Sequence, residues 1–206
     1  MSIMKYRYLA KDNPHQLNGM VKSSGFSLLE VLIAMVVLSI GLLGIAGLQA
    51  TSKRTSYEAL QRTTAVMLTR DIIERMRTNP DQMAAYNGTV DTTTITANDC
   101  STATCTPAQL AAYDLFEWQQ AILGASEIAA DTVTNTGGLV SPVGCITVAA
   151  ACTSCSVTVA IAWRGMTKLS DPSIDTCGNA SGNYDDTAGD NVFRRVIAIN
   201  SFITNN

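Results

Sequence analysis

The chain has 206 residues, of which 47% are hydrophobic and 15% are charged, and its formal net charge is −3. This length allows one domain with a hydrophobic core. The acidic balance argues against nucleic-acid binding, which needs clustered Lys and Arg for phosphate contacts, because the one basic stretch, 62–77, also contains Asp71 and Glu74.

A long apolar stretch lies near the N-terminus. Residues 26–48 contain Glu30 as their only charged residue, and 23 residues are enough to cross a hydrocarbon layer of about 30 Å as a helix. Residues 1–25 carry four basic residues and one acid, whereas the remainder carries ten basic residues and sixteen acids. This asymmetry predicts a cytoplasmic N-terminus and a body exported across the membrane.

The stretch differs from a secretory signal peptide, which has a shorter apolar region that ends at a small-residue cleavage site. Here the small residue, Gly25, precedes the apolar region, and the residues MVKSSG at 20–25 form a short basic leader. Met20 is therefore a candidate start of translation.

The ten residues GFSLLEVLIA, at 25–34, resemble the class III leader junction of type IV pilins and pseudopilins. The resemblance implies that prepilin peptidase cleaves between Gly25 and Phe26 and methylates the new terminal amine of Phe26. Glu30 would then be the fifth residue of the mature chain.

Glu30 would be costly as a lone carboxylate in lipid, so it is expected to have a function and a partner. The resemblance supplies one, because the terminal amine of Phe26 on a neighbouring subunit lies at nearly the same depth. Pairing the two would fix the axial register of the helices. The alternative is a carboxylate that reaches the headgroups from one end of the span.

Glycines recur at intervals of three in the same helix, at Gly41, Gly44 and Gly47. They either form a small-residue face for close helix packing or weaken the helix so that it can extend in a filament. The sequence leaves both interpretations open.

The helix is predicted to continue to Thr78, because residues 49–78 contain neither proline nor glycine and Asn79–Pro80 follows. Apolar residues at spacings of three and four mark the side that packs on the body: Ala65, Leu68, Ile72 and Met76. The pairs Arg70–Glu74 and Asp71–Arg75 are at i,i+4 and are expected on a solvated face, with a partner contact as the alternative.

Two further stretches, 71–89 and 39–49, resemble the PilV group of minor pilins, which share an acid-x-x-acid-Arg-Met-Arg run before a downstream Tyr. Residues 105–123 add a weaker match. There Thr106 can cap and Pro107 can open a second helix. The candidate buried residues of this second helix are Leu110, Leu115 and Trp118.

Three strands are predicted beyond this helix, at 144–150, 156–165 and 194–204, with residues 151–154 as a hairpin turn between the first two. Trp163 is expected in the core. The fold class is therefore α+β: a long N-terminal helix, spanning the membrane with its first half, packs by its second half on a small antiparallel sheet in a pilin-like ladle.

The six cysteines all lie on the exported side, which favours disulfides. Six cysteines allow fifteen pairings. Proximity suggests Cys100 with Cys105, and Cys177 could tether the long loop before the last strand; Cys145 is a further disulfide candidate. Cys152 and Cys155 have the spacing of redox and zinc sites, but His15 is the only histidine and lies in the leader, so a disulfide is favoured.

Residues 183–191 contain three acids and could bind calcium, but an ordinary polar turn is favoured because the far acid of a calcium loop is missing. No phosphate-binding loop, nucleophile elbow or histidine-based acid–base set is found. We therefore expect neither catalysis nor a cofactor, metal or small-molecule substrate.

These observations predict a minor pilin: a leader at 1–25, a membrane or filament-core helix at 26–48, and an exported body at 49–206. Its partners would be prepilin peptidase, other major and minor pilins, and the bacterial inner membrane, before the subunit enters an extracellular type IV pilus. There it would influence initiation, retraction or adhesion. The alternatives are a type II secretion pseudopilin, a membrane-anchored thiol redox protein and a tip adhesin.

Overall fold

The computed structural model describes residues 25–125, 127, 135, 137–149, 154–172, 174–187 and 189–204. The chain forms two compact units that meet between Gly47 and Leu48. Residues 1–24 of the predicted leader lie outside the described residues, as does Cys152.

Helix α1 runs from Leu28 to Thr78 without interruption. Gly25, Phe26 and Ser27 precede it, so it begins two residues later than the sequence predicts. The carbonyl of Ser27 accepts the first bonds, from the amides of Glu30 at 3.0 Å and Val31 at 3.3 Å. At the other end Pro80 opens a short 3-10 helix, η1 (Pro80–Tyr86), which confirms the predicted stop.

Helix α2, Pro107–Leu123, starts at the predicted cap. The amide of Gln109 donates to Thr106 Oγ1, and the amide of Thr106 donates to Gln109 Oε1, so two backbone donors at the helix start are satisfied reciprocally. Gly124 ends the helix in the left-handed conformation, with φ of 69°. Of the three residues predicted to be buried in this helix, Trp118 is fully buried, whereas Leu110 and Leu115 are only half-buried. The prediction is therefore confirmed for Trp118 alone.

Four antiparallel strands form one sheet in the order β1-β2-β3-β4. Their bounds are Gly88–Val90 for β1, Val143–Val148 for β2, Ser154–Arg164 for β3 and Arg194–Thr204 for β4. The three predicted strands are confirmed within two residues at each end, and β1 is an addition. The predicted turn at 151–154 lies mostly outside the described residues.

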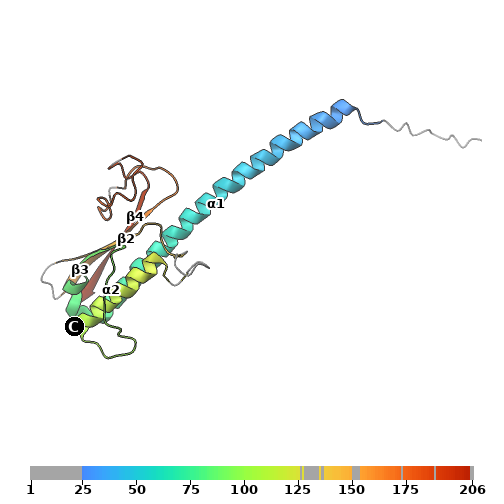
Figure 1. The fold of residues 1–206 in the computed structure, drawn as a ribbon. Coiled ribbons are helices and arrows are strands. Elements are labelled where there is room, and N and C mark those ends of the chain that lie inside the picture. The colour runs from blue at the N-terminus through green and yellow to red at the C-terminus, as the bar shows by residue number, and fades with distance from the viewer. Residues whose placement is uncertain are drawn as a thin grey trace, which may run out of the picture. The chain divides into compact units, whose positions relative to one another are not determined.

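The sheet turns one face to the helices. Its residues Ile146, Val157, Val159, Ile161 and Trp163 share a core with α1 and α2, to which α1 contributes Ala65, Ile72, Ile73 and Met76. Figure 1 shows α2 beside the last part of α1, and the contacts make the two helices antiparallel, since residues 114–117 meet residue 75 and Trp118 meets Leu68.

Gly144 allows a close approach between the helical layer and the sheet. A Cβ atom there would lie 2.7 Å from Cζ3 of Trp118 and closer still to Cη2. The indole Nε1 donates to the carbonyl of Leu68 at 2.9 Å, which links α2 to α1 above the same strand. The predicted α+β, pilin-like fold, with a long apolar helix that packs on a small antiparallel sheet, is therefore confirmed.

Candidate assembly site

The first part of α1 exposes its apolar side chains throughout. Every residue from Gly25 to Tyr57 is exposed, and Phe26, Leu28 and Leu43 are each more than 75% accessible. A helical window of α1 has a mean hydropathy of 2.7 with none of its residues buried, so it is long and apolar enough to span a bilayer. An apolar surface of this size needs lipid or other protein chains around it.

Glu30 lies in the first turn of α1. There a carboxylate interacts favourably with the positive end of the helix dipole. Among residues 25–47 the structure provides no basic side chain, so a cationic partner for Glu30 within lipid must come from a terminal amine or from another chain. The positions of Gly25 and Phe26, exposed and ahead of the helix, leave the peptide bond between them accessible.

The three glycines of this segment are not required by packing within the chain. A Cβ atom built at Gly41, Gly44 or Gly47 meets nothing within 4 Å. Their purpose therefore lies in contacts with other chains or in the helix itself, and both sequence-based interpretations stay predictions.

A polar junction joins the end of α1 to α2 within the body. The guanidinium of Arg75 donates to Asp71 Oδ2 at 3.0 Å, to Glu117 Oε2 at 2.6 Å and to Asp114 Oδ1 at 3.3 Å. The hydrogen bond from Arg75 lowers the pKa of Glu117. The prediction of a solvated face is therefore wrong for Arg75, which contacts a second helix.

Two more residues of the same motif complete the junction. Tyr86 OH donates to Asp114 Oδ2 at 2.6 Å, and Asn79 Nδ2 donates to the carbonyl of Pro107 at 2.8 Å. Burial and the bond to Asp114 raise the pKa of Tyr86 well above its usual range. Arg75 of the acid-x-x-acid-Arg run and the downstream Tyr86 thus both contact Asp114. This contact is not predicted from the sequence, because no local pattern marks Asp114.

The expected pair Arg70–Glu74 does not form, because Glu74 accepts from Arg77 at 2.7 Å instead. This contact is exposed at the surface, as is usual for charges at the end of a helix.

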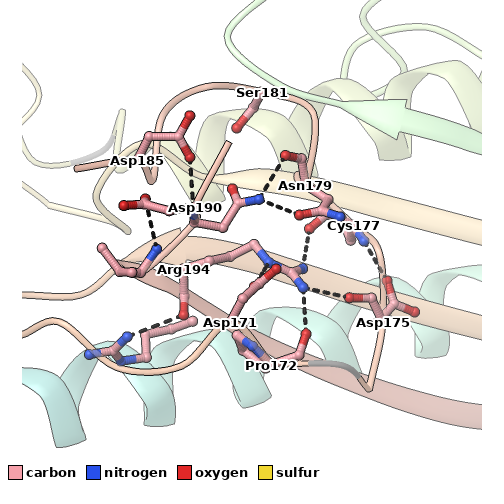
Figure 2. Close-up of polar contacts among 12 residues, drawn as sticks. Asp171, Pro172, Asp175, Cys177, Asn179, Ser181, Asp185, Asp190 and Arg194 are labelled. Carbon is pink, nitrogen blue, oxygen red and sulfur yellow. Dashed lines mark hydrogen bonds and ion pairs between the residues drawn. The ribbon is translucent and has the colours of Figure 1, made fainter. Parts of the chain in front are cut away.

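A second buried arginine holds the loop between β3 and β4 (Figure 2). Arg194 is 2% exposed; its guanidinium donates to Asp171 Oδ1 at 2.6 Å and to the carbonyl oxygens of Pro172, Asp175 and Cys177. One cation therefore satisfies four oxygen atoms spread over seven residues of loop. The sequence gives no sign of this role, since paired arginines at a strand start usually face solvent.

Two of the three acids of the predicted turn at 183–191 accept hydrogen bonds from the backbone of the turn, and the third, Asp186, pairs with Lys168. Asp185 accepts from the amides of Gly189 and Asn191, and Asp190 accepts from the amides of Asp186 and Thr187. These backbone contacts lower the pKa of Asp190 to about 2. The arrangement is that of a polar turn.

The described cysteines of the body are oxidised. Cys100 and Cys105 form one disulfide, and Cys145 and Cys177 form another that ties the long loop to strand β2. Cys155 is also disulfide-bonded, and no described cysteine is free. Cys152, the other half of the C-x-x-C pair, lies outside the described residues.

Two family models match the chain. One, described as a prokaryotic N-terminal methylation motif, covers residues 20–46, which include Gly25, Phe26 and Glu30. The other, described as type IV pilin Tt1218, covers residues 47–116, from α1 through the Asp114 junction. These matches support a type IV pilin. No curated protein and no solved structure matches the chain.

The pilin family that the second model describes is structural, which supports a structural subunit. The methylation motif implies processing by prepilin peptidase and assembly with other pilins. The apolar helix fits anchoring in the inner membrane before the subunit enters the pilus.

Proposed function

We propose that the chain is a minor pilin of the PilV group, cleaved between Gly25 and Phe26 and inserted in low copy into a type IV pilus. Residues 1–25 are the leader, 26–48 enter the membrane and then the filament core, and 49–206 form a body on the periplasmic side. The body influences pilus initiation, retraction or adhesion.

The observation that carries this proposal is the exposed apolar helix with one acid in its first turn, which lies within the matched methylation motif. Because the helix leaves lipid rather than water, close van der Waals packing and polar pairing with other pilin helices stabilise the assembled state. The methylated amine of Phe26 supplies the cation that Glu30 lacks among the described residues of its own helix. Since the amine of one subunit meets the acid of the next only at one axial offset, the pair sets the step between subunits.

The description of the matching family as a type IV pilin supports a pilus rather than a secretion pseudopilus. Recovery of the subunit in sheared surface pili, rather than in a secretion complex, distinguishes the two.

Glu30→Val tests the register role. The variant is expected to reach the membrane and to be cleaved normally, but to be lost from sheared pili, because its neighbour's amine has no partner. Ser39→Ala is the matched control: it removes a polar group from the same helix, where Ser39 Oγ bonds only to the carbonyl of Met35 at 2.7 Å. Equal recovery of Glu30→Val and the control from sheared pili would contradict the role.

A further inference from the structure

Strand β4 forms one edge of the sheet, because the strand order is β1-β2-β3-β4. It pairs with β3 in unbroken register from Arg194 to Thr204, and no described strand lies on its other side. Long, regular edge strands are templates for pairing with another chain, and proteins usually protect them with a charge, a proline or a bulge. Beyond Arg195, β4 contains none of these protective features.

The hydrogen-bond pattern shows which backbone groups of β4 face outward. The amide of Ala149 donates to the carbonyl of Ser156, so the even-numbered residues of β3 bond to β2. The amide of Gly165 donates to the carbonyl of Phe193, so the odd-numbered residues of β3 bond to β4. In this register the even-numbered residues of β4 turn their amides and carbonyls away from β3. We call four of them the free edge, because these groups have no hydrogen-bond partner among the described residues: Val196, Ala198, Asn200 and Phe202.

The side chains of the free edge lie on the face of the sheet that points away from the helices. Ile197 and Ile199, which alternate with them, pack against the core on the helix side. Phe202 is 62% exposed, and Val196 is partly exposed. A strand placed against the free edge would therefore find apolar side chains beside it on the outer face.

Helix α1 runs along β4 in the same direction on the other face. Near the start of the strand, Glu58 Oε1 lies 3.7 Å from Arg195 Nη2. Near its end, Arg77 Nη2 donates to Ser201 Oγ at 3.0 Å. The residues of α1 between Glu58 and Arg77 therefore accompany the whole free edge.

Three arginines of α1 lie along this length. Arg62 lines a cavity together with Arg195 and Val196, which places it at the first residue of the free edge. Arg70 precedes Arg77 by seven residues, so the two lie on the same side of the helix. Arg62 and Arg70 are exposed and form no ion pair with a described residue.

The acids near this edge are already engaged. Glu58 pairs with Arg195, and Glu74 pairs with Arg77. The acids of the loop before β4 gather around Arg194 (Figure 2), at the start of the strand, whereas the free edge extends away from Arg194 toward Thr204. The side of α1 next to the free edge therefore carries an excess of positive charge, from Arg62 and Arg70.

We propose that the free edge accepts an extended acidic segment of a partner protein as an additional strand. Backbone hydrogen bonds supply the pairing, as in other cases of strand addition. The partner's acids lie on the helix side and meet the three arginines, and its apolar side chains lie beside Phe202. A second copy of the chain is disfavoured as the occupant, because it would bring its own arginines to this edge.

The helix sets the spacing of the acids. About 12 Å separates Arg62 from Arg70 along the helix axis, and about 11 Å separates Arg70 from Arg77. Four residues of a strand span about 13 Å, and residues four apart share a face. Acids at every fourth position therefore match the arginines. All of these residues belong to the body unit that begins at Leu48, so the inference does not depend on the proposed assembly of residues 26–48.

Peptide binding to the purified full chain in detergent micelles tests the proposal. The probe is a fluorescent peptide of sequence EVTVEVTVE, and the matched control is KVTVKVTVK, which has the same strand propensity and the opposite charge. Fluorescence anisotropy measures the two dissociation constants. We expect the acidic peptide to bind on the order of tenfold more tightly, from three exposed ion pairs.

Hydrogen exchange at single-residue resolution locates the bound peptide. At a peptide concentration of about ten times Kd, the outward amides of Ala198, Asn200 and Phe202 should exchange roughly tenfold more slowly. The amides of Ile197 and Ile199 already bond to β3, so their exchange should change little.

Two pairs of variants separate the charge from the backbone contact. Arg62→Gln with Arg70→Gln should weaken the acidic peptide by roughly threefold to tenfold, whereas Lys53→Gln with Arg54→Gln, which removes the same charge elsewhere on α1, should not. Asn200→Pro removes one outward amide and should weaken both peptides, whereas Asn200→Ala keeps that amide and should not. If Asn200→Pro does not fold, the glutamine variants and hydrogen exchange still decide.

Equal binding of the two peptides, or slowed exchange outside β4, would overturn the proposal and leave the pilin assignment intact. Slowed exchange at the free edge when the chain is concentrated without peptide would show a second copy as the occupant, and would also overturn it.

Discussion

Gly144→Ala should destabilise the body by overpacking the contact between β2 and Trp118. The added methyl would lie 2.7 Å from Cζ3 of a fully buried indole, which Leu68 holds through its carbonyl, so either the ring or the strand must move. Overpacking of this kind costs about 1–3 kcal/mol. The lower backbone entropy of alanine in the unfolded chain offsets about 0.5–1 kcal/mol of this cost. The net loss is therefore at most about 2.5 kcal/mol, and a contact as short as this one places it near 1–2 kcal/mol.

Thermal unfolding followed by circular dichroism measures the effect. For a chain of this size the loss corresponds to a fall in Tm of about 2–8 °C. Trp118→Phe lacks the outer ring atoms, so Gly144→Ala should cost much less in that background, and the double-mutant cycle isolates the contact. The reasoning is refuted if Tm does not change, or if the substitution costs the same in both backgrounds.

Three further predictions concern the body. Arg194→Met should lower the free energy of unfolding by about 3–5 kcal/mol in chemical denaturation, because it leaves a carboxylate and three carbonyls without their donor. The control Arg164→Met, at a less buried arginine, should lower it far less. Replacing both cysteines of the Cys145–Cys177 disulfide with serine should lower the free energy of unfolding by about 4 kcal/mol, against about 2 kcal/mol for Cys100–Cys105. The difference follows from the sequence separations, which are 32 and 5 residues. Equal losses of Tm would contradict this loop-length argument. The pKa of Tyr86 is raised on folding, so its contribution to the free energy of unfolding is fully present below about pH 10 and is lost as the pH rises through the folded pKa. Tyr86→Phe should therefore flatten the fall of Tm at alkaline pH. An unchanged slope of Tm against pH would count against this prediction.

Local patterns predicted the main elements of the fold. The long run without proline or glycine to Thr78, the Thr106–Pro107 cap and the alternation of β3 and β4 are each specified by neighbouring residues, and each was found within about two residues. Strand β1 was missed because its three residues are a strand only by pairing with β2.

The tertiary contacts could not be predicted in the same way. Arg75 looks like a surface residue in its own helix, and only the return of α2 places Asp114 beside it. Arg194 looks like a solvent-facing residue at a strand start until the loop closes over it. In both cases the partner is many residues away, so no spacing rule reveals it.

The identity of the mature N-terminus tests the central claim most directly. Mass spectrometry of the protein purified from membranes should find a chain that begins at Phe26 and carries one methyl group on its terminal amine. A chain that retains residues 20–25, or that begins elsewhere, would leave Glu30 without the proposed cation and would contradict the assembly mechanism.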